Sequence, residues 1–185
     1  MNTESEPIEL FADWQPDEPG QEKPKNLSFR SARFTDVPEI ARVRAERHGL
    51  EPKAVIKSLA GRFIAEEYIL AMVEKEVVGY GRRTYFTPPE EAPENCVPEG
   101  WYLMGLCVSP EYRRAGIGSD LTRFRARAVS FSANRVYYFV NHLNKPSVAL
   151  HEKLGFKEIA RNVWYPDVTF SNEGEGVLFS QTFKK

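Results

Sequence analysis

A short basic stretch with two glycines stands where the chain changes from a strand-like run to a helix-like run. Residues 113–118 read Arg-Arg-Ala-Gly-Ile-Gly, after the apolar run of 101–108 and before a helical pattern that begins at 117. A helix start exposes unpaired N–H groups and a positive dipole end, and glycine lets another group approach the backbone closely. The stretch therefore predicts an anion-binding turn, most often a phosphate site.

Three phosphate-binding motifs compete for this stretch, beside a plain helix start whose glycines only allow close packing. A P-loop requires a lysine followed by serine or threonine, which this stretch lacks. A dinucleotide fingerprint requires a third glycine where this chain has Leu121. The residues agree with a pyrophosphate cradle of the form Arg-x-x-Gly-x-Gly, formed by Arg113, Gly116 and Gly118.

A second motif lies downstream, at residues 140–156, which read VNHLNKPSVALHEKLGF. Together the two segments resemble the GNAT superfamily of acyl-CoA-dependent N-acyltransferases, strongly over 101–156 and more weakly over 27–185. Two positions depart from the family pattern, with Ser147 where alanine is usual and His151 where tyrosine is usual. The matching residues are Val140, Asn141, Asn144, Leu150, Glu152, Lys153, Leu154, Gly155 and Phe156.

The resemblance implies that acetyl-coenzyme A is the acyl donor. Its pyrophosphate would lie on the backbone N–H groups at the start of the helix, with added charge from the arginine side chains. Its pantetheine arm would pair with the preceding strand like a further strand. The cofactor-binding residues implied are Leu106, Cys107, Val108, Arg113, Arg114, Ala115, Gly116, Ile117, Gly118, Ser119, Asn144, Ser147 and His151.

The implied reaction is the attack of an amine on a thioester. Backbone N–H groups at a bulge near 106–108 would polarise the carbonyl, and His151 would give a proton to the departing thiolate. Many family members carry a glutamate, as a candidate general base, where this chain has Met104 and Gly105. The remaining candidates for the base are Glu99, acting through water, Tyr102, and Glu66 or Glu67.

The acceptor amine is predicted from charge. The loop of 88–99 carries four glutamates, Glu90, Glu91, Glu94 and Glu99, and no basic residue. These carboxylates favour a small cationic acceptor such as an aminoglycoside or amino sugar, unless they merely solvate the loop. An amino acid-like compound, a peptide or protein N-terminus, and a non-catalytic CoA-binding regulatory module are the alternatives.

The composition narrows the class of protein. The chain has 185 residues, a formal net charge of −1 and 42% hydrophobic residues, which indicates a globular protein and argues against nucleic acid as a partner. No signal peptide and no apolar run of membrane-spanning length is visible. Two cysteines and three histidines show no metal-ligand spacing, so we expect a reduced, metal-free, cytoplasmic protein. The resemblance is compatible with a homodimer.

The patterns predict one α/β domain over 27–185, with a mixed sheet flanked by helices. The resemblance implies a V-shaped split between the strands around 101–108 and 135–140. The helix beginning at Gly116 should bury Ile117, Leu121, Phe124 and Ala128, and turn Arg123, Arg125 and Arg127 to solvent. Residues 1–26 are expected to form an acidic, proline-rich tail, either extended or docked through Ile8, Phe11 and Trp14 on this subunit or on a partner.

Overall fold

The computed structural model describes residues 17, 19–170 and 174–184, so Ile8, Phe11 and Trp14 lie outside the described residues. Its α-helices and strands lie between residues 27 and 182. They are β1 (Leu27–Ser31), α1 (Val37–His48), α2 (Pro52–Leu59), β2 (Tyr68–Val73), β3 (Glu76–Phe86), β4 (Gly100–Val108), α3 (Ile117–Ser130), β5 (Arg135–Asn141), α4 (Lys145–Lys153), β6 (Lys157–Arg161) and β7 (Gly176–Thr182). Short 3-10 helices at Phe34–Asp36, Ala65–Glu67 and Pro110–Tyr112 complete the described elements.

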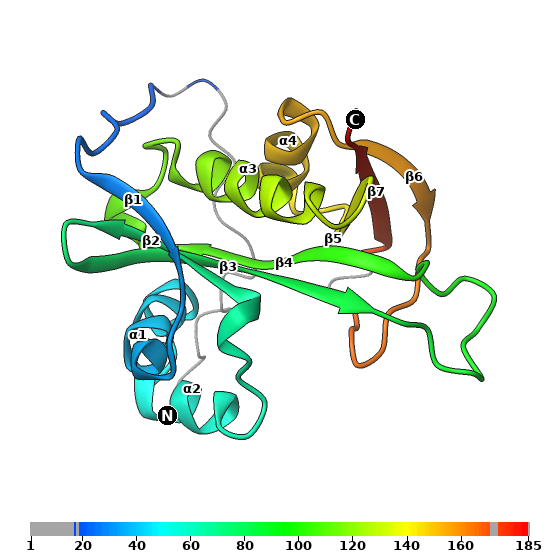
Figure 1. Ribbon diagram of the computed structural model, residues 1–185, viewed down its shortest axis with the longest axis horizontal. Coiled ribbons are helices and arrows are strands. Elements are labelled where there is room, and N and C mark those ends of the chain that lie inside the picture. The colour runs from blue at the N-terminus through cyan, green and yellow to red at the C-terminus, as the bar shows by residue number, and fades with distance from the viewer. Residues whose placement is uncertain (1–16, 18, 171–173, 185) are drawn as a thin grey trace, which may run out of the picture.

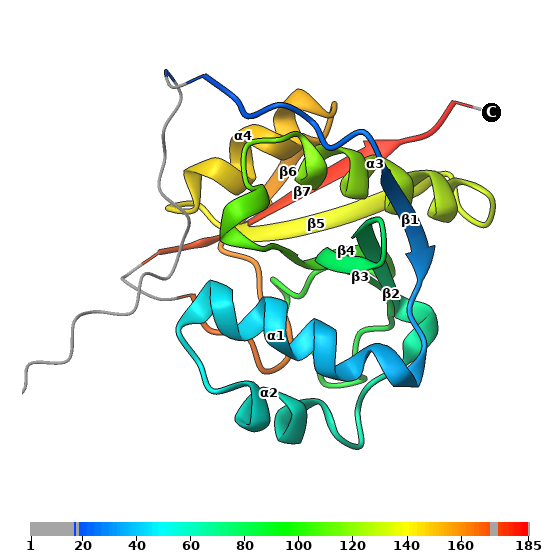
Figure 2. The same cartoon turned by 90° about the vertical axis from the view of Figure 1, so that its left-hand side faces the viewer.

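The strands form one seven-stranded sheet in the order β1-β2-β3-β4-β5-β7-β6. Every neighbouring pair is antiparallel except β4 and β5, which are parallel. Helices α3 and α4 cover one face of the sheet, and α1 and α2 cover the other (Figure 1). The view turned by 90° shows the same two layers, with α1 running along the lower face (Figure 2). The predicted mixed α/β sheet is confirmed.

Each central strand contributes side chains to the apolar cores on both faces of the sheet, because successive side chains point to opposite faces. In β2, Ile69 and Ala71 pack with Leu121 of α3, whereas Leu70 and Met72 pack with the residues of α1 and α2. These four strand residues are all buried, which explains why the sequence shows an apolar run here rather than an alternation.

Helix α1 ends at a glycine and begins after an aspartate. Gly49 follows the helix with φ of 61°, the left-handed conformation that glycine adopts most easily. Asp36 precedes the helix, and its carboxylate accepts two hydrogen bonds from Arg30 and one from the N–H of Arg33. The hydrogen bonds from Arg30 lower the pKa of Asp36. Asp36 therefore links β1 to the turn before α1 through hydrogen bonds.

Helix α3 is rotated from the predicted orientation. The side chains of Arg125 and Thr122 are fully buried, whereas Phe124 is 40% exposed. The prediction that Arg125 is solvated is therefore wrong, because apolar spacing gives no signal for a buried cation whose hydrogen bonds are made by the backbone of another element.

Candidate active site

The site begins where strands β4 and β5 separate. These parallel neighbours share a single residue pair, Tyr102 with Tyr137, close to the start of β4. The remainder of β4, from Leu103 to Val108, has no ladder partner on its β5 side within the described chain. The predicted V-shaped split is confirmed, and it leaves one edge of β4 available to an extended ligand.

A β-bulge interrupts β4 inside the split. Tyr80 of β3 pairs with Cys107 and Arg82 pairs with Met104, so two β4 residues stand opposite one residue of β3. The extra residue is accommodated by Gly105, whose φ is 58°. The bulge turns Leu106 toward α3 and Cys107 toward α1, which reverses the alternation of side chains along the strand.

Arg125 of α3 supports this bulge from the face of the sheet that α3 covers. Its Nη1 donates to the carbonyl oxygens of Arg82 at 2.9 Å and Met104 at 3.0 Å, and its Nη2 donates to Thr122 Oγ1 at 3.1 Å. A Cβ at Gly81 would lie 2.6 Å from Arg125 Cζ, so only glycine leaves room for the guanidinium. Burial lowers the pKa of Arg125 to about 9. The described residues offer it no carboxylate, and the charge is held by backbone oxygens.

A cavity of about 260 Å³ opens beside the bulge, on the face of the sheet covered by α1. The bulge forms one wall of the cavity, and the last turns of α1 and the facing parts of β2 and β3 form the others. The lining residues are Arg44, His48, Tyr68, Tyr80, Arg82, Met104, Gly105, Leu106 and Cys107. Among the residues that the structure describes, this lining contains two arginines and no carboxylate.

His48 contributes an imidazole to the cavity wall, and its surroundings favour the neutral ring. Burial lowers its pKa, and the nearby cations Arg47, Arg44 and Arg113 lower it further. A neutral imidazole can accept a proton from a bound ligand at neutral pH. The adjacent phenol of Tyr80 has its pKa raised by burial, so it remains a hydrogen-bond donor.

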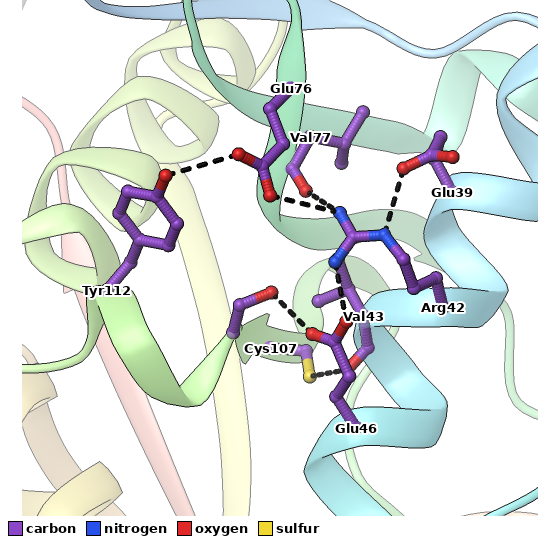
Figure 3. Close-up of polar contacts among 9 residues, drawn as sticks. Glu39, Arg42, Val43, Glu46, Glu76, Val77, Cys107 and Tyr112 are labelled. Atoms are coloured by element: carbon purple, nitrogen blue, oxygen red, sulfur yellow. Dashed lines mark hydrogen bonds and ion pairs between the residues drawn. The ribbon is translucent and has the colours of Figure 1, made fainter.

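A polar network fixes α1, and with it His48, against the sheet (Figure 3). Arg42 is the centre of the network: it contacts three glutamates and the Val77 carbonyl oxygen. Ser109, at the end of β4, donates to Glu46 Oε2 at 2.9 Å. The partners of Arg42 are Glu39, Glu46 and Glu76. These contacts hold the end of α1 at a fixed distance from the bulge.

Helix α3 begins at the far end of β4, in the stretch predicted to bind an anion. Its N-cap is Gly116, with φ of 79° and no side-chain cap, and the first helical hydrogen bond runs from Asp120 N–H to Gly116 O. A Cβ at Gly118 would lie 3.3 Å from Leu150 Cδ1. The uncapped amides and the two glycines agree with an anion site that only a bare backbone can form.

The segment before β1 lies against this turn. The N–H of Gln21 donates to the carbonyl oxygen of Arg114, and Lys23 Nζ lies 2.6 Å from Asp120 Oδ2. Arg123 Nη1 contacts the other oxygen of Asp120 at 3.0 Å. The carboxylate in the first turn of α3 is therefore paired with two cations.

Helix α4 is anchored by residues of the second motif. The side chain of Asn144 caps the helix by accepting from the N–H of Ser147, at 3.3 Å. The hydroxyl of Ser147 is hydrogen-bonded to the hydroxyl of Tyr138 on β5. Both residues thus have structural partners, and their predicted contact with a cofactor stays a prediction.

His151 lies in the core rather than in the cavity. Its ring stacks on Tyr138 with centroids 3.5 Å apart, and its side chain is only 1% exposed. Nδ1 lies 2.8 Å from the carbonyl oxygen of Ser147, so Nδ1 carries the proton. Nε2 is then an acceptor, buried without a partner among the described residues. Burial lowers the pKa to about 3, so the ring is neutral at neutral pH and its one N–H donates to the carbonyl oxygen of Ser147.

The predicted bases are also engaged elsewhere. Glu99 accepts hydrogen bonds from Tyr85 and Thr87, and the buried hydroxyl of Tyr102 donates to the carbonyl oxygen of Pro98. Burial raises the pKa of Tyr102, which opposes a role as a base. Neither residue lines the cavity, and the acidic loop of 88–99 precedes β4, whereas the cavity lies along its second half.

Of the other base candidates, Glu67 accepts from Thr84 and lies 3.4 Å from Arg82 Nε. Glu66 is in the 3-10 helix before β2 and outside the cavity lining. The four cavity residues that matter most for charge, Arg44, His48, Tyr80 and Arg82, were not singled out from the sequence. A signal existed in the run Gly-Tyr-Gly-Arg-Arg at 79–83, where bulky polar residues interrupt a strand pattern.

Comparisons with known proteins agree with this geometry. The profile of the family described as Acetyltransferase (GNAT) matches residues 34–156. A protein named N-alpha-acetyltransferase from Sulfurisphaera tokodaii is 30% identical over 149 residues, with 74% of this chain and 84% of the relative covered. A protein of the same name from Saccharolobus solfataricus is 25% identical over 75% of this chain and 85% of its own length.

Solved structures share the fold. The ribosomal-protein-S18-alanine N-acetyltransferase from Escherichia coli superposes with a TM-score of 0.61 over 86% of this chain and 95% of its own, at 17% identity. The N-acetyltransferase from Staphylococcus aureus Mu50 superposes with a TM-score of 0.60 over 86% of this chain and 100% of its own, at 18% identity. Within the described residues, no helix combines the length and apolar character needed to cross a bilayer.

Proposed function

Because the chain belongs to the GNAT family of acetyltransferases and is an acyl-CoA-dependent N-acyltransferase, we propose that it acetylates the α-amine of a peptide or protein N-terminus. The observation that carries the proposal is the cavity at the β4 bulge, which joins a neutral imidazole to an unpaired strand edge. The curated relatives bear the name N-alpha-acetyltransferase, which supports the same acceptor.

GNAT enzymes use acetyl-CoA, which supplies the thioester whose acetyl group is transferred. The uncapped start of α3 fits its pyrophosphate, with the amides of Ile117, Gly118 and Ser119 as donors. The open edge of β4 at Leu106 and Val108 fits the pantetheine arm. The backbone of the bulge would hold the thioester oxygen through its N–H groups, as an oxyanion hole does.

His48 takes the role of the base that the sequence left unassigned. Its lowered pKa keeps the ring neutral near pH 7, so the imidazole can accept a proton from the acceptor ammonium. The cations that surround it disfavour a positive charge on the amine and on His48 alike, so the proton would pass from the amine through His48 to water rather than stay on the ring. The hydroxyl of Tyr80 lies in the same cavity and can donate a hydrogen bond to a departing thiolate.

An α-amine suits this weak base better than a lysine side chain does. An α-amino group has a pKa near 8, so about a tenth of it is neutral at pH 7, whereas a lysine near 10.4 is neutral in fewer than one molecule in a thousand. A cationic amino sugar is also a poor match for a cavity lined by Arg44 and Arg82 without a carboxylate. The acidic loop, which suggested such an acceptor, lies away from the cavity.

The test is an acetylation assay with three kinds of acceptor: peptides with free N-termini, the same peptides with a blocked N-terminus and an internal lysine, and an aminoglycoside. Thiol release gives the rate, and mass spectrometry locates the acetyl group. We expect acetylation of the free N-terminus only. Transfer to lysine or to the aminoglycoside in preference would overturn the acceptor, and acetyl-CoA binding without any transfer would indicate a non-catalytic module.

A further inference from the structure

The charge of the cavity lining indicates more about the acceptor than the type of amine it carries. Resting on the acceptor site proposed above, we infer that the acceptor carries a carboxylate close to its reactive amine, and that Arg44 binds this carboxylate with help from Arg82. The first basis for this inference is the part of the lining that the structure describes, which contains two guanidinium groups and no acidic side chain.

Arg44 is the stronger of the two anion sites. It projects from the last turns of α1 into the cavity wall and is partly buried. Among the described residues it has no hydrogen bond and no ion pair, in contrast to Arg42 on the same helix, which contacts three glutamates and the Val77 carbonyl oxygen. A guanidinium left without a partner in a cavity wall is a donor set suited to a carboxylate, which it can bind through two parallel hydrogen bonds.

Arg82 is partly neutralised. Its Nε lies 3.4 Å from Glu67 Oε2, and that nitrogen is buried without a hydrogen bond among the described residues. Within the described part of the chain, the Arg82 Nη2 group contacts only the sulfur of Met104, at 3.7 Å, and so keeps donor capacity toward the cavity. The carboxylate of Glu67 satisfies Arg82 in part and leaves Arg44 unpaired.

The neighbouring charges increase the need for an anion. Arg113 lies close enough to lower the pKa of His48, and Glu46, the acid of α1 nearest to His48 in the sequence, is bound to Arg42 and Ser109. An acceptor with a carboxylate beside its ammonium would bring an anion to Arg44 while the amine approaches His48. The carboxylate can be an acidic side chain at the start of a peptide or the α-carboxylate of a free amino acid.

Two matched pairs of acceptors distinguish a carboxylate on a peptide side chain from the α-carboxylate of a free amino acid. The first pair is Met-Glu and Met-Gln at the start of an otherwise identical peptide, and the second is free leucine and leucinamide. We expect kcat/KM to be at least tenfold higher for the carboxylate member of one pair. Arg44→Gln should bring that ratio near one, and Arg44→Glu should favour Met-Lys over Met-Glu. Arg127→Gln, which removes the same charge from an exposed position on α3, should keep the wild-type ratio.

The outcomes are distinct from those of the proposed function. If no peptide is acetylated but free leucine is, the N-terminal acceptor fails and the carboxylate site stands. If peptides are acetylated with equal kcat/KM for both members of both pairs, the carboxylate site is wrong although the enzyme class holds. A preference that survives Arg44→Gln would also overturn the role given to Arg44.

Discussion

Arg125 Nη1 lies 3.0 Å from the carbonyl oxygen of Met104, the last residue before the bulge of β4. This contact joins a buried cation on α3 to the strand that forms the candidate active site. The same nitrogen holds the carbonyl oxygen of Arg82 across the ladder, so both sides of the bulge depend on one side chain. Arg125 therefore acts as a positioning residue, since it lies outside the cavity lining.

The first prediction concerns this support. Arg125→Met would leave two buried carbonyl oxygens without their donor, and each costs about 1–3 kcal/mol of the free energy of unfolding. In the fraction that stays folded, we expect kcat to fall at least tenfold while the Kd for acetyl-CoA changes less than threefold. Denaturant titration, steady-state rates and calorimetry measure the three quantities. A folded Arg125→Met enzyme with the wild-type kcat would show that the bulge forms without this support.

The second prediction concerns the turn before α3. Gly116→Asp adds a side chain and a negative charge where the pyrophosphate is proposed to lie, and should abolish acetyl-CoA binding in calorimetry. Gly61→Asp is the matched control, because Gly61 also has a positive φ, of 81°, and open space around it. Both variants carry similar backbone strain. Equal affinity of the two variants for acetyl-CoA would show that the cofactor does not bind at this turn.

The third prediction concerns Lys23. Lys23→Gln would leave Asp120 paired with Arg123 alone, so more negative charge would face the proposed pyrophosphate site. We expect the Kd for acetyl-CoA to rise about two- to fivefold at low salt. The difference should shrink above about 0.1 M salt, because exposed charges are then screened. Lys25→Gln, with the same charge change on the same exposed segment, should bind as the wild type does. Identical isotherms for both variants would contradict the idea.

The fourth prediction concerns His48. If it accepts the proton of the acceptor amine, His48→Gln should lower kcat by tenfold or more, within the range of general bases. Its pKa is below the ordinary 6.5, so the activity that depends on His48 should persist at pH 6.5 and decline only at lower pH. His142→Gln is the control, since His142 accepts a hydrogen bond from the N–H of Glu175 outside the cavity. A pH profile of kcat unchanged by His48→Gln would exclude the role.

The fifth prediction concerns His151 and acid stability. Its pKa is about 3 in the folded protein and near 6.5 when unfolded, so between these values the unfolded state binds more protons. This contribution to stability is complete above pH 6.5 and is lost as pH falls toward 3, by up to about 1.4 kcal/mol per pH unit. Denaturant titrations at several pH values should show a shallower acid decline for His151→Gln. A parallel decline in both proteins would mean that the buried ring does not resist protonation.

The sequence by itself determined the elements and the family. The apolar runs of β2 and β4, the glycine after α1 and the two motifs at 113–118 and 140–156 are local signals, because strand alternation, helix ends and anion-binding turns are set by residues close together in the chain. They led to the mixed α/β sheet, the split beside β4 and the acetyl-CoA donor, and the structure and the comparisons confirm these expectations.

Tertiary structure alone decided which side chains meet in the cavity. Arg44 and His48 come from α1 and Arg82 comes from β3, and no spacing in the sequence shows that they face one bulge. The same limit applies to charge: Arg125 and His151 have the sequence signature of surface or reactive groups, yet both are buried. Burial and partners depend on contacts between distant segments, and they determine whether an ionisable group is solvated, structural or able to move a proton.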